Sequence, residues 1–246
     1  MMTAARAPRE RQGRPHARKS SSVSLGRRPR RDLIAEAVIE LLAREGGRGL
    51  THGNIDAWLS LPRGSTSFYF RRRAELLEAG LRRLVTEDLE QLNRALGPLF
   101  ERYRGTIPVR EVARCQYELW RRQAQPSMRN RTIARFEFFL HAARDRQFGK
   151  FHDRIRRAIF AFGQSMFARM GAKDPRGAAV EYGYLIRGDS MAYFLLPPSI
   201  GRHRITPAYY ERCLHEIIDK TNKLPVETGA TRRGGIDSHS EGDSRA

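Results

Sequence analysis

Residues 51–70 read THGNIDAWLSLPRGSTSFYF, and this stretch decides the fold. Thr51 is a suitable N-cap for a short helix that buries Ile55, because its hydroxyl can accept a hydrogen bond from an unpaired amide of the first turn. Pro62 suits the first turn of a second short helix, where the amide that proline lacks would be unpaired anyway. This second helix ends near Phe70. A short helix, a tight turn and a second short helix form a helix-turn-helix.

The rest of the chain has the apolar periodicity of helices. Before Thr51, apolar residues repeat on one helical face from Leu33 to Leu42, and glycines from Gly46 onward end that helix. A long helix begins near Ala74, and Gly97-Pro98 is expected to end or break it. Further helices are expected at 108–123, 127–143, 148–170, 176–195 and 207–221. Since no stretch alternates as a strand would, the sequence predicts an all-α fold.

The second short helix carries the chemistry of DNA recognition. Arg63 can reach a phosphate or a guanine edge, and small hydroxyl residues follow it at the start of the helix. The helix N-terminus adds a favourable dipole for a phosphate. We expect DNA to be contacted by a set drawn from both helices and from the arginine run that follows: Thr51, Arg63, Gly64, Ser65, Thr66, Ser67, Phe68, Tyr69 and Arg73. Phe68 and Tyr69 could equally pack this second short helix against the core.

These residues also carry a resemblance to a known family. Over residues 31–80 the sequence resembles the TetR-like (tetracycline-repressor-like) bacterial transcription regulators. The likeness rests on AREGG at the end of the first helix, on Thr51 and Ile55, and on LPRGSTSFYFRRRAELLEAGL. The family's typical threonine, isoleucine, turn glycine, small residue, phenylalanine, basic residue and leucine correspond to Thr51, Ile55, Gly64, Ser65, Phe70, Arg73 and Leu76.

Four positions depart from the family pattern. Ser60 stands where the family usually has its turn glycine, Asp56 replaces a small alanine, and Trp58 is bulkier than usual. Ser67 falls where many members have a phosphate-binding tyrosine, so we expect Tyr69 to contact the phosphate instead.

The resemblance implies two further partners besides double-stranded DNA. The last two long helices would pair with those of a second subunit, and such a homodimer would read a palindromic operator. The middle helices would enclose a cavity for a small-molecule effector of unknown identity, whose binding releases the DNA. The expected cavity residues are Trp120, Phe136, Phe139, His141 and Tyr182. The expected domains are a helix-turn-helix domain at 31–74 and an effector-binding and dimerisation domain at 75–222.

Charge distribution supports a polyanionic partner. The chain has 246 residues, with 46 Lys and Arg against 27 Asp and Glu, a formal net charge of +19. Residues 1–31 alone hold ten Lys and Arg and one Glu. We expect 1–30 to be a disordered basic arm and 223–246 to be a disordered tail. The arm could reach into a neighbouring minor groove, or it could be a solvated tail that only raises the non-specific affinity for DNA.

Other classes of protein find less support in the sequence. There is no HExxH, GxSxG, P-loop or GxGxxG motif and no zinc-type cysteine spacing, so we expect no enzyme activity, metal or cofactor. No apolar run could span a bilayer, and a cytoplasmic, nucleoid-associated location is expected. A non-specific nucleoid or RNA-binding protein would be equally basic. A membrane-surface protein would need an amphipathic helix, for which 148–170 is the nearest candidate.

Overall fold

The computed structural model describes residues 29–197 and 204–223, and these residues form helices with no strand among them. The elements are α1 (Arg30–Gly49), α2 (His52–Trp58), α3 (Ser65–Tyr69), α4 (Arg73–Arg102), α5 (Val109–Gln123), the 3₁₀ helix η1 (Pro126–Met128), α6 (Arg129–Arg144), α7 (Arg146–Arg169), α8 (Pro175–Phe194) and α9 (Pro207–Lys223). The predicted all-α fold is confirmed. The expected basic arm and C-terminal tail lie almost wholly outside the described residues.

The start of the second helix agrees with the sequence pattern. The Thr51 hydroxyl accepts a hydrogen bond from the Asn54 amide at 3.1 Å, which satisfies one of the free donors of α2. Upstream, α1 is interrupted at Gly46, where φ is 63°. This left-handed conformation favours glycine and accounts for the predicted end of the first helix.

Pro62 is expected in the first turn of the second short helix, which is α3 in the structure, and this expectation is wrong. α3 begins only at Ser65, and its N-cap is Gly64, with φ at 90°. Pro62 lies in the turn before it, where its carbonyl accepts hydrogen bonds from the amide and the hydroxyl of Ser65. The left-handed glycine reverses the chain after the proline, so the helix cannot start earlier.

The expected break at Gly97-Pro98 is also wrong, because α4 continues through it to Arg102. A side chain before proline normally clashes with the proline ring in helical conformation, and Gly97 has none. The missing amide of Pro98 leaves the carbonyl of Arg94 unpaired, but both residues lie on an exposed face, open to water. Leu96 and Leu99 are buried on the opposite face and hold the helix together there.

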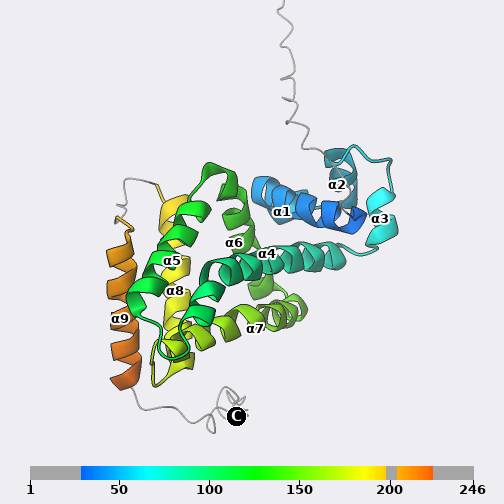
Figure 1. Cartoon of the computed structure of the whole chain (residues 1–246). Helices are drawn as coiled ribbons and strands as arrows, with labels where there is room; N and C mark the ends of the chain where they lie inside the picture. Colours follow the sequence, from blue (N-terminus) through cyan, green and yellow to red (C-terminus); the bar gives the residue numbers. More distant parts are fainter. Residues whose placement is uncertain (1–28, 198–203, 224–246) are drawn as a thin grey trace, which may run out of the picture.

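Two apolar cores organise the molecule. The first joins α1, α2 and the first half of α4 to α6 and the start of α7, with Ile34, Ile55 and Phe138 fully buried. The second joins the end of α4 to α5, α7, α8 and α9 around Phe167 and Tyr210. In Figure 1, α1–α3 form a head at one side of the molecule, and α9 lies at the opposite side. The described helices include none long and apolar enough to cross a membrane.

Candidate nucleic-acid interface and ligand cavity

One carboxylate fixes the third helix to the second. Asp56 of α2 is 2% exposed and accepts hydrogen bonds from the Gly64 amide at 2.8 Å and the Thr66 amide at 2.8 Å. It also accepts one from the Thr66 hydroxyl at 2.6 Å. Because the N-cap of α3 is a glycine without a side chain, Asp56 supplies the capping oxygen from the neighbouring helix. Burial alone would raise the pKa of Asp56, but these hydrogen bonds outweigh it, and the net pKa is lowered.

The turn between α2 and α3 uses a strained residue. Ser60 has a φ of 54°, and it is the one non-glycine residue with positive φ in ranges 29–197 and 204–223. It occupies the position where the TetR-like pattern has glycine, the residue that adopts such a φ most readily. The turn is closed by a hydrogen bond from the Leu61 amide to the Asp56 carbonyl at 2.8 Å.

The outer face of the head presents a mixed polar and aromatic surface. Arg63, Ser67 and Phe68 are exposed, with Phe68 at 83%. Its ring is held edge-on against that of Tyr69, whose centroid is 5.2 Å away. Gly64 has open space around the position that a Cβ would occupy. A backbone or phosphate could therefore approach this face closely.

Besides Thr51 and Ser65, three more of the expected contact residues have structural partners. Thr66 is fully buried against Asp56, so its side chain positions α3 and cannot reach DNA. Tyr69 is half-buried and packs against the first core. Arg73 donates hydrogen bonds to the carbonyls of Leu50 and Gly47, which ties the start of α4 to the end of α1.

The other arginines of the run 71–73 differ in their surroundings. Arg72 is paired with Glu75 at 2.9 Å. Arg71 is exposed, and its guanidinium has no partner among residues 29–197 and 204–223. Trp58 lies on the surface at 38% exposure, with the Arg44 guanidinium 4.7 Å from its ring centroid, and does not fill the core.

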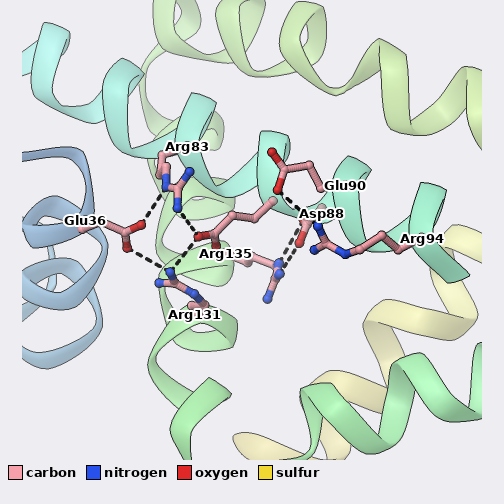
Figure 2. A network of polar contacts seen from close by, with 8 residues as sticks. Glu36, Arg83, Asp88, Glu90, Arg94, Arg131 and Arg135 are labelled. Carbon is pink, nitrogen blue, oxygen red and sulfur yellow. Dashed lines mark hydrogen bonds and ion pairs between the residues drawn. The ribbon is translucent and has the colours of Figure 1, made fainter. Parts of the chain in front are cut away.

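A network of ion pairs joins the head to the body. Glu36 of α1 lies between Arg83 of α4, at 2.6 Å, and Arg131 of α6, at 2.9 Å (Figure 2). Glu87 of α4 binds the same two arginines at 2.8 and 2.9 Å. Burial raises the pKa of Glu36, but the two arginines outweigh it and hold the pKa below its usual value. Three helices thus meet in one compensated cluster of charges.

A cavity of about 690 Å³ lies within the body, between α4, α5, α6, α7 and α8. This volume suits a drug-sized ligand. Of the residues expected to line it, Phe136, Phe139 and Tyr182 do so. Trp120 is outside it, packed edge-on against Tyr193 in the second core. His141 is also outside, stacked edge-on against Phe148 near the junction with the head.

The cavity wall carries cations of two kinds. Arg135 is neutralised by Asp88, to which it donates two hydrogen bonds. Arg156 of α7 and Arg187 of α8 have no carboxylate within ion-pair distance in the described part of the chain. Their guanidinium carbons lie 5.1 and 6.0 Å from the centroid of the same ring, that of Phe139. Both arginines are half-buried, and this burial lowers the pKa of each.

One further polar group, the imidazole of His152, faces the same space. Burial, and then the nearby Arg156, lower the pKa of His152, so this imidazole is neutral at pH 7. The Tyr182 hydroxyl is buried and has no hydrogen-bond partner in ranges 29–197 and 204–223. Although Tyr182 lines the cavity, this oxygen is closed to it, because the atom has almost no accessible surface.

The sequence pattern holds a signal for this site that apolar periodicity alone does not show. His152, Arg156 and Phe160 follow each other at intervals of four, as do Gly183 and Arg187, so each set lies on one helical face. A charged residue on an otherwise apolar face marks either an ion pair or a ligand site. No local pattern marks Asp56, which lies eight residues before Gly64, the N-cap of the helix that it caps.

No protein-family model matches the sequence, and no curated protein matches it. Solved structures match it in fold. A transcriptional regulator from Rhodococcus sp. Rha1 has a TM-score of 0.60 at 17% identity, over 80% of this chain and 100% of that chain. A candidate TetR-family regulator from Mesorhizobium loti has a TM-score of 0.59 at 16% identity, over 78% of this chain and 95% of that chain. A candidate transcriptional regulator from Saccharomonospora viridis, in complex with choline, has a TM-score of 0.55 at 16% identity, over 77% of this chain and 95% of that chain.

The chain therefore has the fold of the TetR-type transcriptional regulators. The resemblance that residues 31–80 carry and the arrangement of the whole helical body lead to the same fold. At these low identities the comparison establishes the fold, and the activity has to be argued from the site.

Proposed function

We propose that the protein is a dimeric transcription regulator, most simply a repressor, that binds a palindromic DNA operator and is released from it by a small-molecule effector. The observation that carries this proposal is the α3 unit, a short helix with an exposed outer face whose inner face is fixed by Asp56. The proposed domains are 31–74 for DNA binding and 75–222 for effector binding and dimerisation. We propose no catalytic role.

The exposed residues of the head have the chemistry that a major groove requires. Arg63 and Arg71 are cations whose guanidiniums have no partner in the part of the chain that the structure describes, so each can pair with a phosphate or a guanine edge. Phe68 is an exposed apolar side chain next to them, and such groups contact the thymine methyl. Ser67 can donate to a phosphate, and Tyr69 can do so from its half-buried position, whereas the Ser65 hydroxyl donates to the Pro62 carbonyl. Thr66 and Arg73 hold the recognition helix in place.

A face of α8 supports the homodimer. Tyr184, Met191 and Leu195 are exposed large apolar residues, at 63%, 45% and 38%, and their spacing puts them along one side of the helix. Gly188 lies between them with open space around it, so a second helix could approach closely. A two-fold pairing there would set two copies of α3 side by side for a palindrome.

The ion-pair network offers a connection between ligand and DNA. α6 supplies Arg131 to the cluster that holds α1, and one turn later it supplies Arg135 to the cavity wall. A ligand that displaces α6 would therefore change the position of the head, α1–α3, relative to the body. Effector binding acts only through such a difference between two arrangements.

The direct test is to select DNA from a random pool at ~0.15 M salt, where surface charges are largely screened. We expect an inverted repeat with half-sites about one helical turn apart, roughly 34–36 Å. Arg63→Ala and Arg71→Ala should weaken binding to that repeat at least about fivefold, since a specific contact is worth about 1–3 kcal/mol.

The matched control is Arg114→Ala, which removes one positive charge from an exposed position on α5, far from the head along the chain. This variant should bind like the parent protein. Retention of DNA without an enriched sequence would favour the alternative, a non-specific basic nucleic-acid-binding protein, which the net charge of +19 also permits. Equal losses in all three variants would lead to the same conclusion.

A further inference from the structure

The inner wall of the cavity holds more positive than negative charge. Among its ionisable residues, Arg135 and Asp88 neutralise each other, and Asp153 is 83% exposed beside His152. Arg157 is exposed to solvent, which leaves the half-buried Arg156 and Arg187, and neither guanidinium of these two donates a hydrogen bond within the described ranges. Charges removed from water normally have a partner, since an unpaired buried charge is costly.

The geometry of these two arginines brings them to one place. They come from different helices, α7 and α8, yet both lie over the ring of Phe139 from α6. The ring face compensates part of each charge through a cation–π interaction. The cation–π contact does not engage the N–H groups at the edges of the two guanidiniums. These are the groups that bind an oxyanion in paired hydrogen bonds.

The rest of the wall is mostly apolar, with a few uncharged polar residues such as Gln116 and Thr132. Leu92, Phe136, Ile159, Phe160, Phe162 and Met166 are among the lining residues. A ligand that fills the space must bury a hydrocarbon or aromatic body against these side chains.

We propose that the cavity binds an amphipathic organic anion, with an aromatic or aliphatic body against the phenylalanines and a carboxylate, sulfonate or phosphate held between Arg156 and Arg187. The claim that this anion is the effector rests on the proposed function. The claim that the cavity selects an anion stands without it. The choline of the Saccharomonospora viridis complex is a cation, and these two arginines would repel it.

A pair of fluorescent probes tests the proposal on the full-length protein without DNA. Anilinonaphthalene sulfonate carries the anion, and phenylnaphthylamine is the same ring system without it. Arg156→Gln and Arg187→Gln should each weaken sulfonate binding at least tenfold, or about 1.4 kcal/mol. Binding of the neutral probe should change less than about threefold, since the apolar wall is intact. Arg156→Lys keeps the charge and should retain part of the affinity.

Arg154→Gln is the matched control, because Arg154 lies on the same helix, is exposed, and does not line the cavity. It should leave both probes unaffected. Circular dichroism and thermal unfolding establish that each variant is folded. If Arg156→Gln does not fold, Arg187→Gln alone provides the test. Unchanged sulfonate binding in the arginine variants overturns the proposal, as does an equal loss of the neutral probe, which would mean that the arginines only shape the cavity. Failure of the proposed function appears instead in the DNA selection.

Discussion

Asp56 shows how a single side chain can place a recognition helix. Its two carboxylate oxygens accept three hydrogen bonds from Gly64 and Thr66 while the side chain is almost fully buried. A helix of five residues has too few internal hydrogen bonds to be stable alone. The carboxylate therefore determines both whether α3 forms and where it points.

We expect Asp56→Ala to destabilise the protein by about 2–3 kcal/mol, because it removes a cap and leaves buried donors unsatisfied. The lowered pKa of Asp56 sets the pH range of this effect. The stabilisation is complete above 3.8, the ordinary pKa, and is lost as pH falls further and the carboxylate is protonated. Urea unfolding of both proteins at pH 7 and at pH 3 measures the difference, which should shrink at pH 3. An equal difference at both pH values would contradict the role of the charge.

The role of Asp56 could not be predicted from the sequence, although the helix-turn-helix could. The motif depends on local signals, such as the Thr51 cap, the glycine turn and the apolar spacing around Ile55, and all of these are visible in one short window. The hydrogen bonds of Asp56 depend on how two helices cross. The same limit applies to Thr66, which has the chemistry of a DNA contact but faces inward.

At the level of helices, α4 connects the head to the body. Its first half packs against α1 and its second half against α5. The sequence predicted its start and its apolar stripe but not its passage through Gly97-Pro98, because a proline signal is local and the burial of Leu96 and Leu99 is not. Within this helix, Gly80 is buried against α1, where its hydrogen faces Val38 and Phe138.

We expect Gly80→Ala to destabilise the protein by about 1–3 kcal/mol, despite the better helix propensity of alanine. The added Cβ would lie 2.6 Å from Val38 Cγ1 and 3.1 Å from Phe138 Cζ, so α4 and α1 would have to separate. Gly53→Ala in α2 is the control, because nothing lies within 4 Å of the Cβ there. It should be neutral or stabilising by up to about 1 kcal/mol. Thermal unfolding that ranked Gly80→Ala as the more stable variant would show that the helices are not closely packed.

For the whole molecule, the sequence predicted a cavity in the helical body but only part of its wall. Phe136, Phe139 and Tyr182 line it, whereas the equally aromatic Trp120 fills the second core. Periodicity shows which face of a helix is apolar, but not whether that face meets another helix or an open space. Arg156 and Arg187 come from different helices and meet only through the tertiary fold.

The proposed dimer makes the last prediction at this scale. Met191→Glu places a charge at the centre of the apolar face of α8, and two copies facing each other across a two-fold axis would repel and would lose water. We expect this variant to sediment as a folded monomer at concentrations where the parent protein is a dimer. Its affinity for the full inverted repeat should fall much more than its affinity for a single half-site, because a monomer gains nothing from the second half-site. Leu140→Glu is the control: Leu140 and Met191 are both 45% exposed, but Leu140 is on α6, outside the proposed face. A Met191→Glu protein that stays dimeric would mean that the subunits pair through another surface, whereas loss of the dimer in both variants would widen the interface to α6.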